Sequence, residues 1–289
     1  MRVYLLDANG LSHWLWHEAD NDAAGNETQL GERVTKWWRE FCETMHPTHF
    51  VACFDGAKNW RKSVFAEYKA NRLAKPPDEG KLAALRTIPG LWRSLGVKTI
   101  TCETFEADDV IAALAAKWSF DAEIITIATD KDMLQLVEQH GARWPLQYDP
   151  RPNKAGECVF YSATSVEEKM GVSPHRIAEL LAIMGDAADN VPGIKGIGKV
   201  QATVAIRQTK TAAEMFRKAA KGELANITAA NQAKIVAGRE DFELSLKLVT
   251  LRYDAPIDLT IDDAAIAPWF PRVDEQLIAD GARIAEEKS

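Results

Sequence analysis

Acidic residues follow four predicted β-strands, and this repeated pattern constrains the fold of the chain more than any other feature. Apolar runs predict the strands at Arg2–Leu6, His49–Phe54, Gly96–Cys102 and Glu123–Ala128. The acids that follow them are Asp7, Asp55, Glu106 and Asp130. In a parallel sheet the carboxyl ends of the strands form one edge, and ligand sites gather there. The pattern therefore predicts an α/β fold with a mostly parallel central sheet, flanking helices and an acidic site at one edge.

Acids are densest between the third and fourth strands and just after the fourth. Three of them open an apolar run that has the spacing of a core-facing helix, namely Glu106, Asp108 and Asp109. Free N–H groups and the helix dipole favour carboxylates in a first turn, so helix capping is one interpretation of these three. Capping does not explain Asp130 and Asp132, which follow the next strand.

A further acidic pair, Asp186 and Asp189, is three residues apart and could share one helix face. The complete candidate set is Asp7, Asp55, Glu106, Asp108, Asp109, Asp130, Asp132, Asp186 and Asp189. Like charges gathered this closely repel one another and raise one another's pKa unless cations neutralise them. Hard divalent ions prefer oxygen ligands, so the set predicts a divalent-metal site.

The net charge of −7 argues at first against a nucleic-acid partner. Taking the nine candidate ligands from the 42 Asp and Glu leaves 33, against 35 Lys and Arg. If metal masks the nine acids, the remaining surface is slightly basic. The local distribution of charge then matters more than the net value.

An insertion at about residues 57–95, between the second and third strands, is basic and aromatic. Its candidate DNA-contacting residues are Arg61, Lys62, Tyr68, Lys69 and Arg72. Basic side chains with interleaved aromatics suit a surface that neutralises phosphates and stacks bases. The alternative is a solvated amphipathic helix. The position of the insertion beside Asp55 favours the nucleic-acid interpretation. A second helix is predicted from Asp78 to Leu95, after the Pro76–Pro77 pair.

A glycine-rich turn between two predicted helices is a second candidate DNA-binding element. Its candidate residues are Gly193, Lys195, Gly196, Gly198 and Lys199. Glycines permit positive φ and close backbone approach, and the following helix N-terminus offers free N–H groups to a phosphate. Such contacts would hold duplex without sequence preference. Turns of this kind also simply join helices, so the glycine spacing alone is weak support.

The second half of the chain is mostly helical. A hairpin-like pair is predicted near Arg143–Gln147 and Glu157–Tyr161, and helices at Ser162–Met170, Pro174–Met184, Lys199–Arg207, Thr211–Lys221 and Ala229–Leu251. We expect three parts: a metal-dependent core at 1–161, a helical DNA-binding lobe at 162–251, and a C-terminal segment at 252–289 that packs on the core and ends in a helix. No signal peptide or membrane span is predicted, so we expect a cytoplasmic protein that has no membrane partner.

Seven motifs together resemble the structure-specific 5′ nucleases, a family that includes flap endonucleases, the 5′-nuclease domain of bacterial DNA polymerase I and free-standing phage and bacterial 5′-3′ exonucleases. The motifs are LLDANG (5–10), FDG (54–56), YKANR (68–72), FEADD (105–109), ATDKD (128–132), GDAADNVPGIKGIG (185–198) and LSLKLVTL (244–251). They occur in the family's order over about residues 3–251, and we expect a free-standing enzyme of the bacterial or phage type.

The resemblance implies two Mg²⁺ ions, with Mn²⁺ as a substitute. Asp7, Asp55, Glu106 and Asp108 would serve the first ion, with Asp109 nearby, and Asp130, Asp132, Asp186 and Asp189 the second. Two ions roughly 4 Å apart can activate a water and stabilise a leaving oxygen in phosphodiester hydrolysis. Lys69 and Arg72 match the family's basic arch, and with Asp7 and Asp108 they are the candidate catalytic residues.

The resemblance also implies a helix-three-turn-helix element in the helical lobe, with K⁺ bound in its turn. The expected substrate is duplex DNA with a 5′ end, a nick or a 5′ flap, cleaved by a monomer. Whether exonuclease or flap-endonuclease action predominates, and whether an RNA–DNA hybrid is accepted, stays open at this stage.

Two other functions compete with that of a nuclease. An aspartyl-phosphate phosphatase also begins with a strand that ends in Asp, but it needs a second acid two residues later, where this chain has Asn9. A non-catalytic duplex-DNA-binding module with a structural metal is the other alternative. A structural ion needs about six to eight oxygens, and nine carboxylates beside Lys69 and Arg72 exceed that need.

Overall fold

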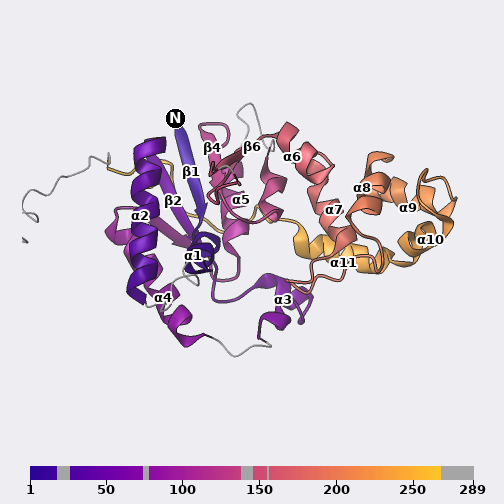
Figure 1. Ribbon diagram of the computed structural model, residues 1–289, viewed down its shortest axis with the longest axis horizontal. Coiled ribbons are helices and arrows are strands. Elements are labelled where there is room, and N and C mark those ends of the chain that lie inside the picture. The colour runs from indigo at the N-terminus through magenta and orange to yellow at the C-terminus, as the bar shows by residue number, and fades with distance from the viewer. Residues whose placement is uncertain (18–26, 74–77, 138–145, 155, 268–289) are drawn as a thin grey trace, which may run out of the picture.

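The computed structural model describes residues 1–17, 27–73, 78–137, 146–154 and 156–267 (Figure 1). One six-stranded sheet has the order β3-β2-β1-β4-β5-β6, and every pair in it is parallel except β5 with β6. The strands are β1 Arg2–Asp7, β2 His49–Phe54, β3 Lys98–Thr101, β4 Glu123–Ile127, β5 Leu146–Asp149 and β6 Val159–Tyr161. The four parallel strands predicted from apolar runs and the antiparallel pair after them are confirmed. Residues 143–145 of the predicted pair lie outside the described residues.

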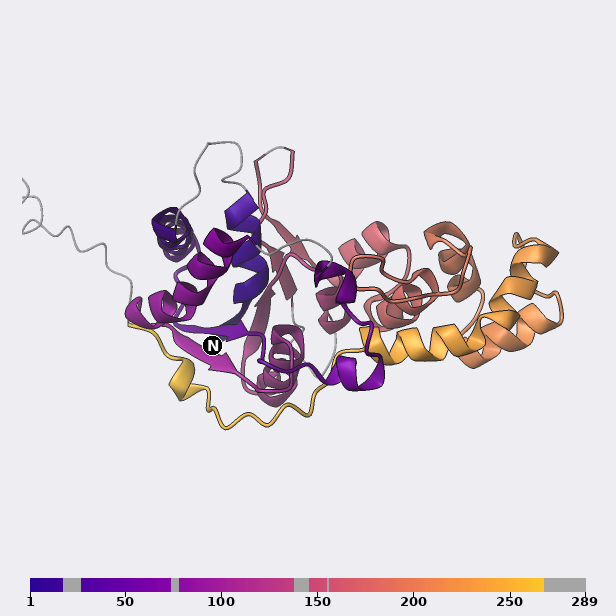
Figure 2. The same ribbon diagram turned by 90° about the horizontal axis from the view of Figure 1, so that it is seen from below.

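Helices cover both faces of the sheet (Figures 1 and 2). They are α1 Ala8–His17, α2 Glu27–Met45 and α4 Glu79–Ser94 on one face, and α5 Ala107–Trp118 on the other. Strand β1 lies between these layers, with Val3 and Leu5 packed towards α5, and Tyr4 and Leu6 packed towards α1, α2 and α4. A strand that is apolar on both sides belongs in the middle of such a sheet. Its carboxyl end, at Asp7, is therefore held rigidly.

A helical lobe extends from one end of the sheet and has its own hydrophobic core (Figure 2). Its elements are α6 Ala163–Met170, α7 Ile177–Met184, α8 Lys199–Arg207, α9 Ala212–Ala220, α10 Ala229–Ala237 and α11 Arg239–Val249. A short 3₁₀ helix, Pro174–Arg176, precedes α7. The expected single helix at Ala229–Leu251 is wrong, because Gly238 separates α10 from α11. A Cβ at Gly238 would lie 2.6 Å from Ile194 Cγ2, so only glycine allows this close contact with the turn.

The insertion begins with α3 Trp60–Val64, continues through a 3₁₀ helix at Ala70–Leu73, and returns through α4. The predicted helix from Asp78 is confirmed, because the Asp78 side chain accepts a hydrogen bond from Lys81 N and caps α4. Residues 74–77 lie outside the described residues. Tyr68 is 4% exposed and belongs to the core of the lobe, with Phe65 packed against it. The start of the insertion is therefore fastened to the lobe rather than solvated on all sides.

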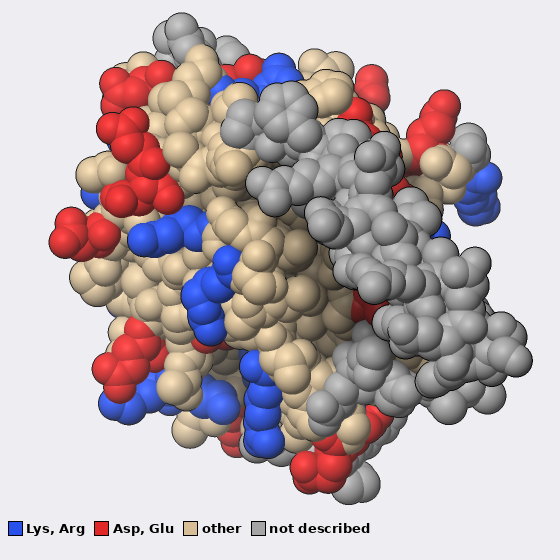
Figure 3. Space-filling model, turned by 90° about the vertical axis from the view of Figure 1, so that its left-hand side faces the viewer, with Lys and Arg blue, Asp and Glu red and all other residues tan. Residues whose placement is uncertain are grey.

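After α11 the chain returns along the sheet, where Leu251, Leu259 and Ala264 are buried against the α5 face (Figure 2). The expected terminal helix falls at residues 268–289, outside the described residues, and the three-part division of the chain stays a prediction. Within the described ranges, no helix has the length and apolar character needed to cross a membrane. Where described side chains are visible in Figure 3, acidic and basic residues are interspersed.

Candidate active site

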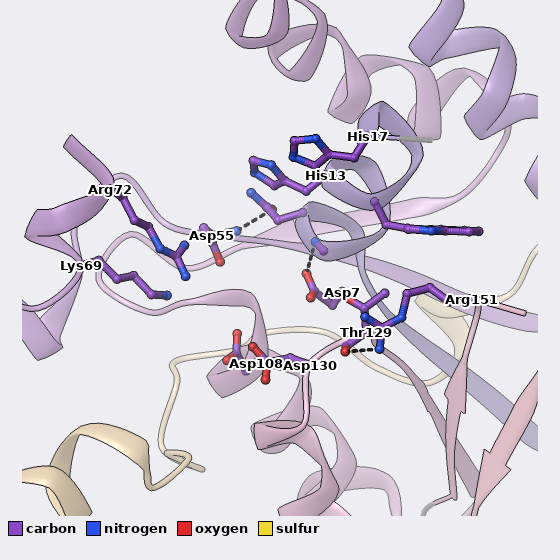
Figure 4. Close-up of a pocket in the computed structure, with 13 residues that line it drawn as sticks. Asp7, His13, His17, Asp55, Lys69, Arg72, Asp108, Thr129, Asp130 and Arg151 are labelled. Carbon is purple, nitrogen blue, oxygen red and sulfur yellow. Dashed lines mark hydrogen bonds between the residues drawn. The ribbon is translucent and has the colours of Figure 1, made fainter. Parts of the chain in front are cut away.

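A cleft of about 410 Å³ opens at the carboxyl edge of the sheet (Figure 4). It is lined by Asp7, Asn9, Gly10, His13, Trp14, His17, Asp55, Lys69, Arg72, Asp108, Thr129, Asp130 and Arg151. Asp7 ends β1, Asp55 follows β2, and Asp130 follows β4. The sheet thus brings together acids that the sequence separates by more than 40 residues, as predicted. Lys69 and Arg72 project into the cleft from the insertion (Figure 4).

Backbone N–H groups orient two of these carboxylates. Gly10 N donates to Asp7 Oδ1 at 2.8 Å, and Ala107 N, at the start of α5, donates to Asp55 Oδ1 at 2.9 Å. A Cβ at Gly10 would come within 2.2 Å of Asp7 Oδ2, so a side chain at position 10 would displace the carboxylate. In both Asp7 and Asp55 a backbone hydrogen bond therefore fixes Oδ1, and this sets the orientation of the whole carboxylate in the cleft.

Desolvation disfavours the charged forms of the cleft acids. Burial raises the pKa of Asp7 to about 7, helped by the charges of Asp55 and Asp130. The pKa of Asp108 is raised well above its usual value by burial and then by Glu106 and Asp7, and the pKa of Asp55 is raised by desolvation. Carboxylates in this condition gain most from a nearby cation, because it offsets both the desolvation and the repulsion.

Asp109 and Arg61 form a buried ion pair, so neither has the role predicted for it. Arg61 is 2% exposed, and its guanidinium contacts Asp109 at 2.7 and 2.9 Å. Asp109 is 0% exposed and also accepts hydrogen bonds from Trp60 Nε1 at 2.9 Å and Arg252 N at 3.0 Å. Each carboxylate oxygen of Asp109 thus accepts two hydrogen bonds, so neither oxygen has a lone pair left for a metal ion. Arg61 lies inside the protein rather than on a DNA-facing surface.

Glu106 connects this buried pair to the cleft. Its Oε2 accepts from Arg61 Nη1 at 2.9 Å and from the Tyr68 hydroxyl at 3.1 Å, and its Oε1 pairs with Lys69 Nζ. The predicted contact of Tyr68 with DNA is therefore wrong in this structure, because the ring is buried and its hydroxyl holds Glu106. Lys62, by contrast, is exposed, as a DNA-contacting residue requires.

The second set of acids is bridged by basic side chains. Lys131 Nζ lies 2.5 Å from Asp186 Oδ2 and 3.8 Å from Asp132 Oδ1. Asp189 pairs with Arg72 and lies 3.7 Å from Lys69 Nζ. Lys131 was not predicted as a site residue, although its position between two candidate ligands, Asp130 and Asp132, indicates that it lies at the site.

One atom of this second set has no donor. No described residue gives a hydrogen bond to Asp132 Oδ1, which is buried. Burial and then the charge of Asp130 raise the pKa of Asp132 well above its usual value. A buried carboxylate oxygen without a donor is costly, and a bound cation would satisfy it. The Lys131 ammonium lies 3.8 Å away, beyond hydrogen-bond distance, so this oxygen is free to accept a cation and the second set fits a metal ion.

The acids share one edge but do not form a closed ligand shell. Over the described ranges, no three His, Cys, Asp or Glu side chains converge closely enough to hold a metal ion. The ammonium groups of Lys69 and Lys131 instead lie between the carboxylates. The assignment of these acids to two metal ions stays a prediction.

The glycine-rich turn lies between α7 and α8 in the helical lobe. Gly193 and Gly196 have φ of 63° and 78°, as the sequence predicted for this turn. Gly193 is buried, its N–H donates to Ser245 Oγ at 2.9 Å, and a Cβ there would lie 2.3 Å from Gly185 N. Its role is thus to close the turn rather than to contact DNA. The other four candidates, Lys195, Gly196, Gly198 and Lys199, are exposed.

Five further residues line the cleft without having been predicted from the sequence. His13, Trp14 and His17 reach it from α1, and Thr129 and Arg151 come from the segments after β4 and β5 (Figure 4). Arg151 donates to Thr129 O at 2.7 Å and to both oxygens of Asp149, and so fixes the loop after β4. Apart from the i, i+4 spacing of the two histidines, no local pattern marks these residues.

Two family models match adjoining parts of the chain. The 5′-3′ exonuclease N-terminal resolvase-like domain matches residues 2–171, and the 5′-3′ exonuclease C-terminal SAM fold matches residues 172–272. The chain is 34% identical to the 5′-3′ exonuclease of Bacillus subtilis (strain 168), over 77% of the chain and 71% of that protein. It is 30% identical to the flap endonuclease Xni of Shewanella amazonensis (strain ATCC BAA-1098 / SB2B), over 92% of the chain and 99% of that protein.

Solved structures share the fold. T5 5′-exonuclease with bound zinc superposes with a TM-score of 0.71 at 19% identity, over 86% of this chain and 89% of that one. The catalytic core of Rad2 in complex with DNA substrate superposes with a TM-score of 0.57 at 17% identity, over 95% of this chain and 84% of that one. The overall fold is therefore shared at sequence identities below 20%.

Proposed function

The chain belongs to the 5′-3′ exonuclease family, and on that premise we propose that its nuclease activity resides in the acidic cleft. The reaction is hydrolysis of phosphodiester bonds at 5′ ends, nicks or 5′ flaps of DNA. One observation carries the proposal: acids from the ends of three parallel strands lie in one cleft with Lys69 and Arg72. An anionic DNA backbone can enter an acidic cleft only if cations neutralise the carboxylates, and the carboxylates of this cleft are suitable ligands for such cations.

Two Mg²⁺ ions are the proposed cofactors, with Mn²⁺ as a substitute. Asp7, Asp55, Glu106 and Asp108 would hold the first, and Asp130, Asp132, Asp186 and Asp189 the second. Support comes from the raised pKa of Asp7 and Asp108 and from the donorless Asp132 Oδ1. The T5 exonuclease with the same fold binds divalent metal ions. When bound, such ions activate a water and neutralise developing charge on the leaving oxygen. K⁺ in the glycine-rich turn stays a prediction.

Lys69 and Arg72 act on the substrate phosphate. Lys69 is 19% exposed and its ammonium pairs with Glu106, while Arg72 is 56% exposed and pairs with Asp189. Both can exchange a carboxylate partner for a phosphate oxygen without leaving the cleft. A donor fixed where negative charge develops stabilises the transition state more than the bound substrate. Arg72 also has the planar donor geometry that suits phosphate.

The helical lobe holds the duplex part of the substrate. Exposed Lys195, Gly196, Gly198 and Lys199 present positive charge and backbone N–H groups at the start of α8. These contacts reach phosphates and not base edges, so binding is independent of sequence. Lys62, exposed on α3, is a further candidate for contact with the substrate backbone. The protein acts as a monomer in the cytoplasm. Sedimentation of the purified chain tests whether it is a monomer.

A panel of end-labelled substrates tests the activity. Single strand, nicked duplex, 5′-flap duplex and RNA–DNA hybrid are incubated with protein in Mg²⁺ or in excess EDTA, and the products are mapped. We expect metal-dependent cleavage at the flap junction, the nick or the 5′ end. Tight duplex binding without any cleavage would favour the non-catalytic module instead.

Lys69→Ala tests the assigned site. We expect single-turnover cleavage to fall ~100-fold, because a transition-state contact of about 2.7 kcal/mol is lost. Flap affinity should change several-fold at most. Lys58→Ala is the matched control, because Lys58 is on the same insertion, is 70% exposed and pairs only with Glu103 among the ion pairs described. Equal single-turnover rates for Lys69→Ala and the control would remove Lys69 from the reaction.

A further inference from the structure

Two loops far apart in the sequence are joined beside the cleft. We call residues 65–73 the lysine loop and residues 185–191 the acidic loop. Lys69 N donates to Asp189 O at 2.9 Å, Asn71 Nδ2 to Ala187 O at 2.6 Å, and Asn190 Nδ2 to Glu67 O at 2.8 Å. Three hydrogen bonds within a few residues thus connect the insertion to the lobe.

The backbone at this junction is in an uncommon conformation. Lys69 has φ of 56° and Asn190 has φ of 58°, both in the left-handed region. Asn adopts this region with little difficulty, whereas a long side chain such as Lys rarely does. A residue remains there only when its surroundings hold it, and such residues often serve a functional site.

The acidic loop is stiff enough to provide that support. Its ends are closed by paired hydrogen bonds, Asp186 N to Val191 O at 3.0 Å and Val191 N to Asp186 O at 2.8 Å. Val191 is buried in the core of the lobe, and so is Tyr68, which precedes Lys69. The lysine loop is therefore held on one side by the lobe core and on the other by the acidic loop.

We propose that the acidic loop positions Lys69, and that Asn71 and Asn190 are positioning residues for cleavage although neither lines the cleft. A change of φ at Lys69 would swing its Cα–Cβ bond and carry the ammonium away from Glu106 and Asp189. This inference rests on the proposed role of Lys69 in the reaction. It assigns to Asn190 a role separate from those of its neighbours Asp186 and Asp189, whose carboxylates face Lys131, Lys69 and Arg72.

Asn190→Gly is the informative variant, because glycine keeps the left-handed backbone and removes only the amide that holds Glu67 O. Asn226→Gly is its matched control, since Asn226 also has φ of 58° and is exposed in the lobe, just before α10. Single-turnover cleavage of a 5′ flap is measured in Mg²⁺, and flap affinity in Ca²⁺. We expect Asn190→Gly to cleave ~10-fold more slowly with affinity within about twofold, because small misplacement of a catalytic group is costly. Asn71→Ala should act in the same direction, and Asn226→Gly should change neither quantity.

A double variant separates positioning from general weakening of the fold. If Asn190 acts through Lys69, adding Asn190→Gly to Lys69→Ala should slow cleavage by less than about twofold further. A full additional ~10-fold loss would overturn the inference, and so would an unchanged rate for Asn190→Gly when Lys69→Ala is slow. If Lys69→Ala itself cleaved at the wild-type rate, the proposed role of Lys69 would fail, and this inference with it.

Discussion

Replacing Arg61 by Met should destabilise the protein strongly, even though the residue was first expected on its surface. The guanidinium joins α3, which carries Arg61, to two other helices. It pairs with Asp109 and Glu106 at the start of α5, and its Nε donates to Leu248 O in α11 at 2.7 Å. Met fills a similar volume without charge, so the change removes the interactions and leaves the packing largely in place.

The size of the effect follows from what remains around Asp109. Breaking a buried pair by removing one partner usually costs about 3–5 kcal/mol, because the other charge stays buried and uncompensated. Asp109 would keep the donors Trp60 Nε1 and Arg252 N. The cost should therefore lie near the lower limit, about 3 kcal/mol, which for a chain of this size lowers Tm by roughly 6 °C.

Thermal unfolding followed by circular dichroism checks this, with Lys58→Met as the control. Lys58 and Glu103 form an ion pair at 2.6 Å whose side chains are 70% and 68% exposed. Such surface pairs contribute about 0.5 kcal/mol, or roughly 1 °C here. Adding Asp109→Asn to Arg61→Met should recover at least half of the loss, because the stranded charge is gone. A Tm for Arg61→Met within about 1 °C of the Lys58→Met value would refute this account of the buried pair.

Four further outcomes are expected. Excess EDTA should abolish cleavage of a labelled flap, and full activity in EDTA would contradict the metal-dependent mechanism. Asp108→Ala should nearly abolish single-turnover cleavage while flap binding persists in a gel-shift assay; a rate within about twofold of wild type would reject its assignment as a ligand. Gly196→Val should weaken duplex binding equally for unrelated sequences, measured by fluorescence anisotropy, because the contacts are to the backbone. The pKa of Asp7 is raised to about 7, and that of Asp108 is also raised, so a divalent ion must displace protons at acidic pH. Ca²⁺ affinity measured by calorimetry should therefore fall at least about tenfold from pH 8 to pH 6.

The sheet and its acidic edge could be predicted because their signals are local. Each strand is a short apolar run that ends at an acid, and parallel pairing then places Asp7, Asp55 and Asp130 together without further information. Asp108 could also be predicted from a local signal, because it opens an apolar run that has helical spacing and becomes the first turn of α5. Helix ends with a capping residue or a glycine, such as Asp78 before α4, were also readable from the sequence.

What could not be predicted depends on partners that are distant in sequence. Arg61 and Tyr68 look like DNA-binding residues because they are basic and aromatic in a charged insertion. Their burial is decided by Leu248 and Glu106, which lie 187 and 38 residues away along the chain. The break at Gly238 has the same origin, since an isolated glycine is tolerated in a helix and only the contact with Ile194 shows why the helix divides there.

The positive partners of the acidic cleft fall into two kinds that differ in exposure. Arg61 is 2% exposed and its partner Asp109 is 0% exposed, so this pair is part of the core and cannot exchange for an ion or a phosphate. The side chains of Lys69 and Lys131 are 19% and 40% exposed, and each lies within ion-pair distance of two of the proposed metal ligands. Because ion pairs near water can exchange at small cost, these two lysines could release their carboxylates to divalent ions, and Lys69 would remain in the cleft that it lines. The released Lys69 ammonium would then face the incoming phosphate, which is the role proposed for it in cleavage.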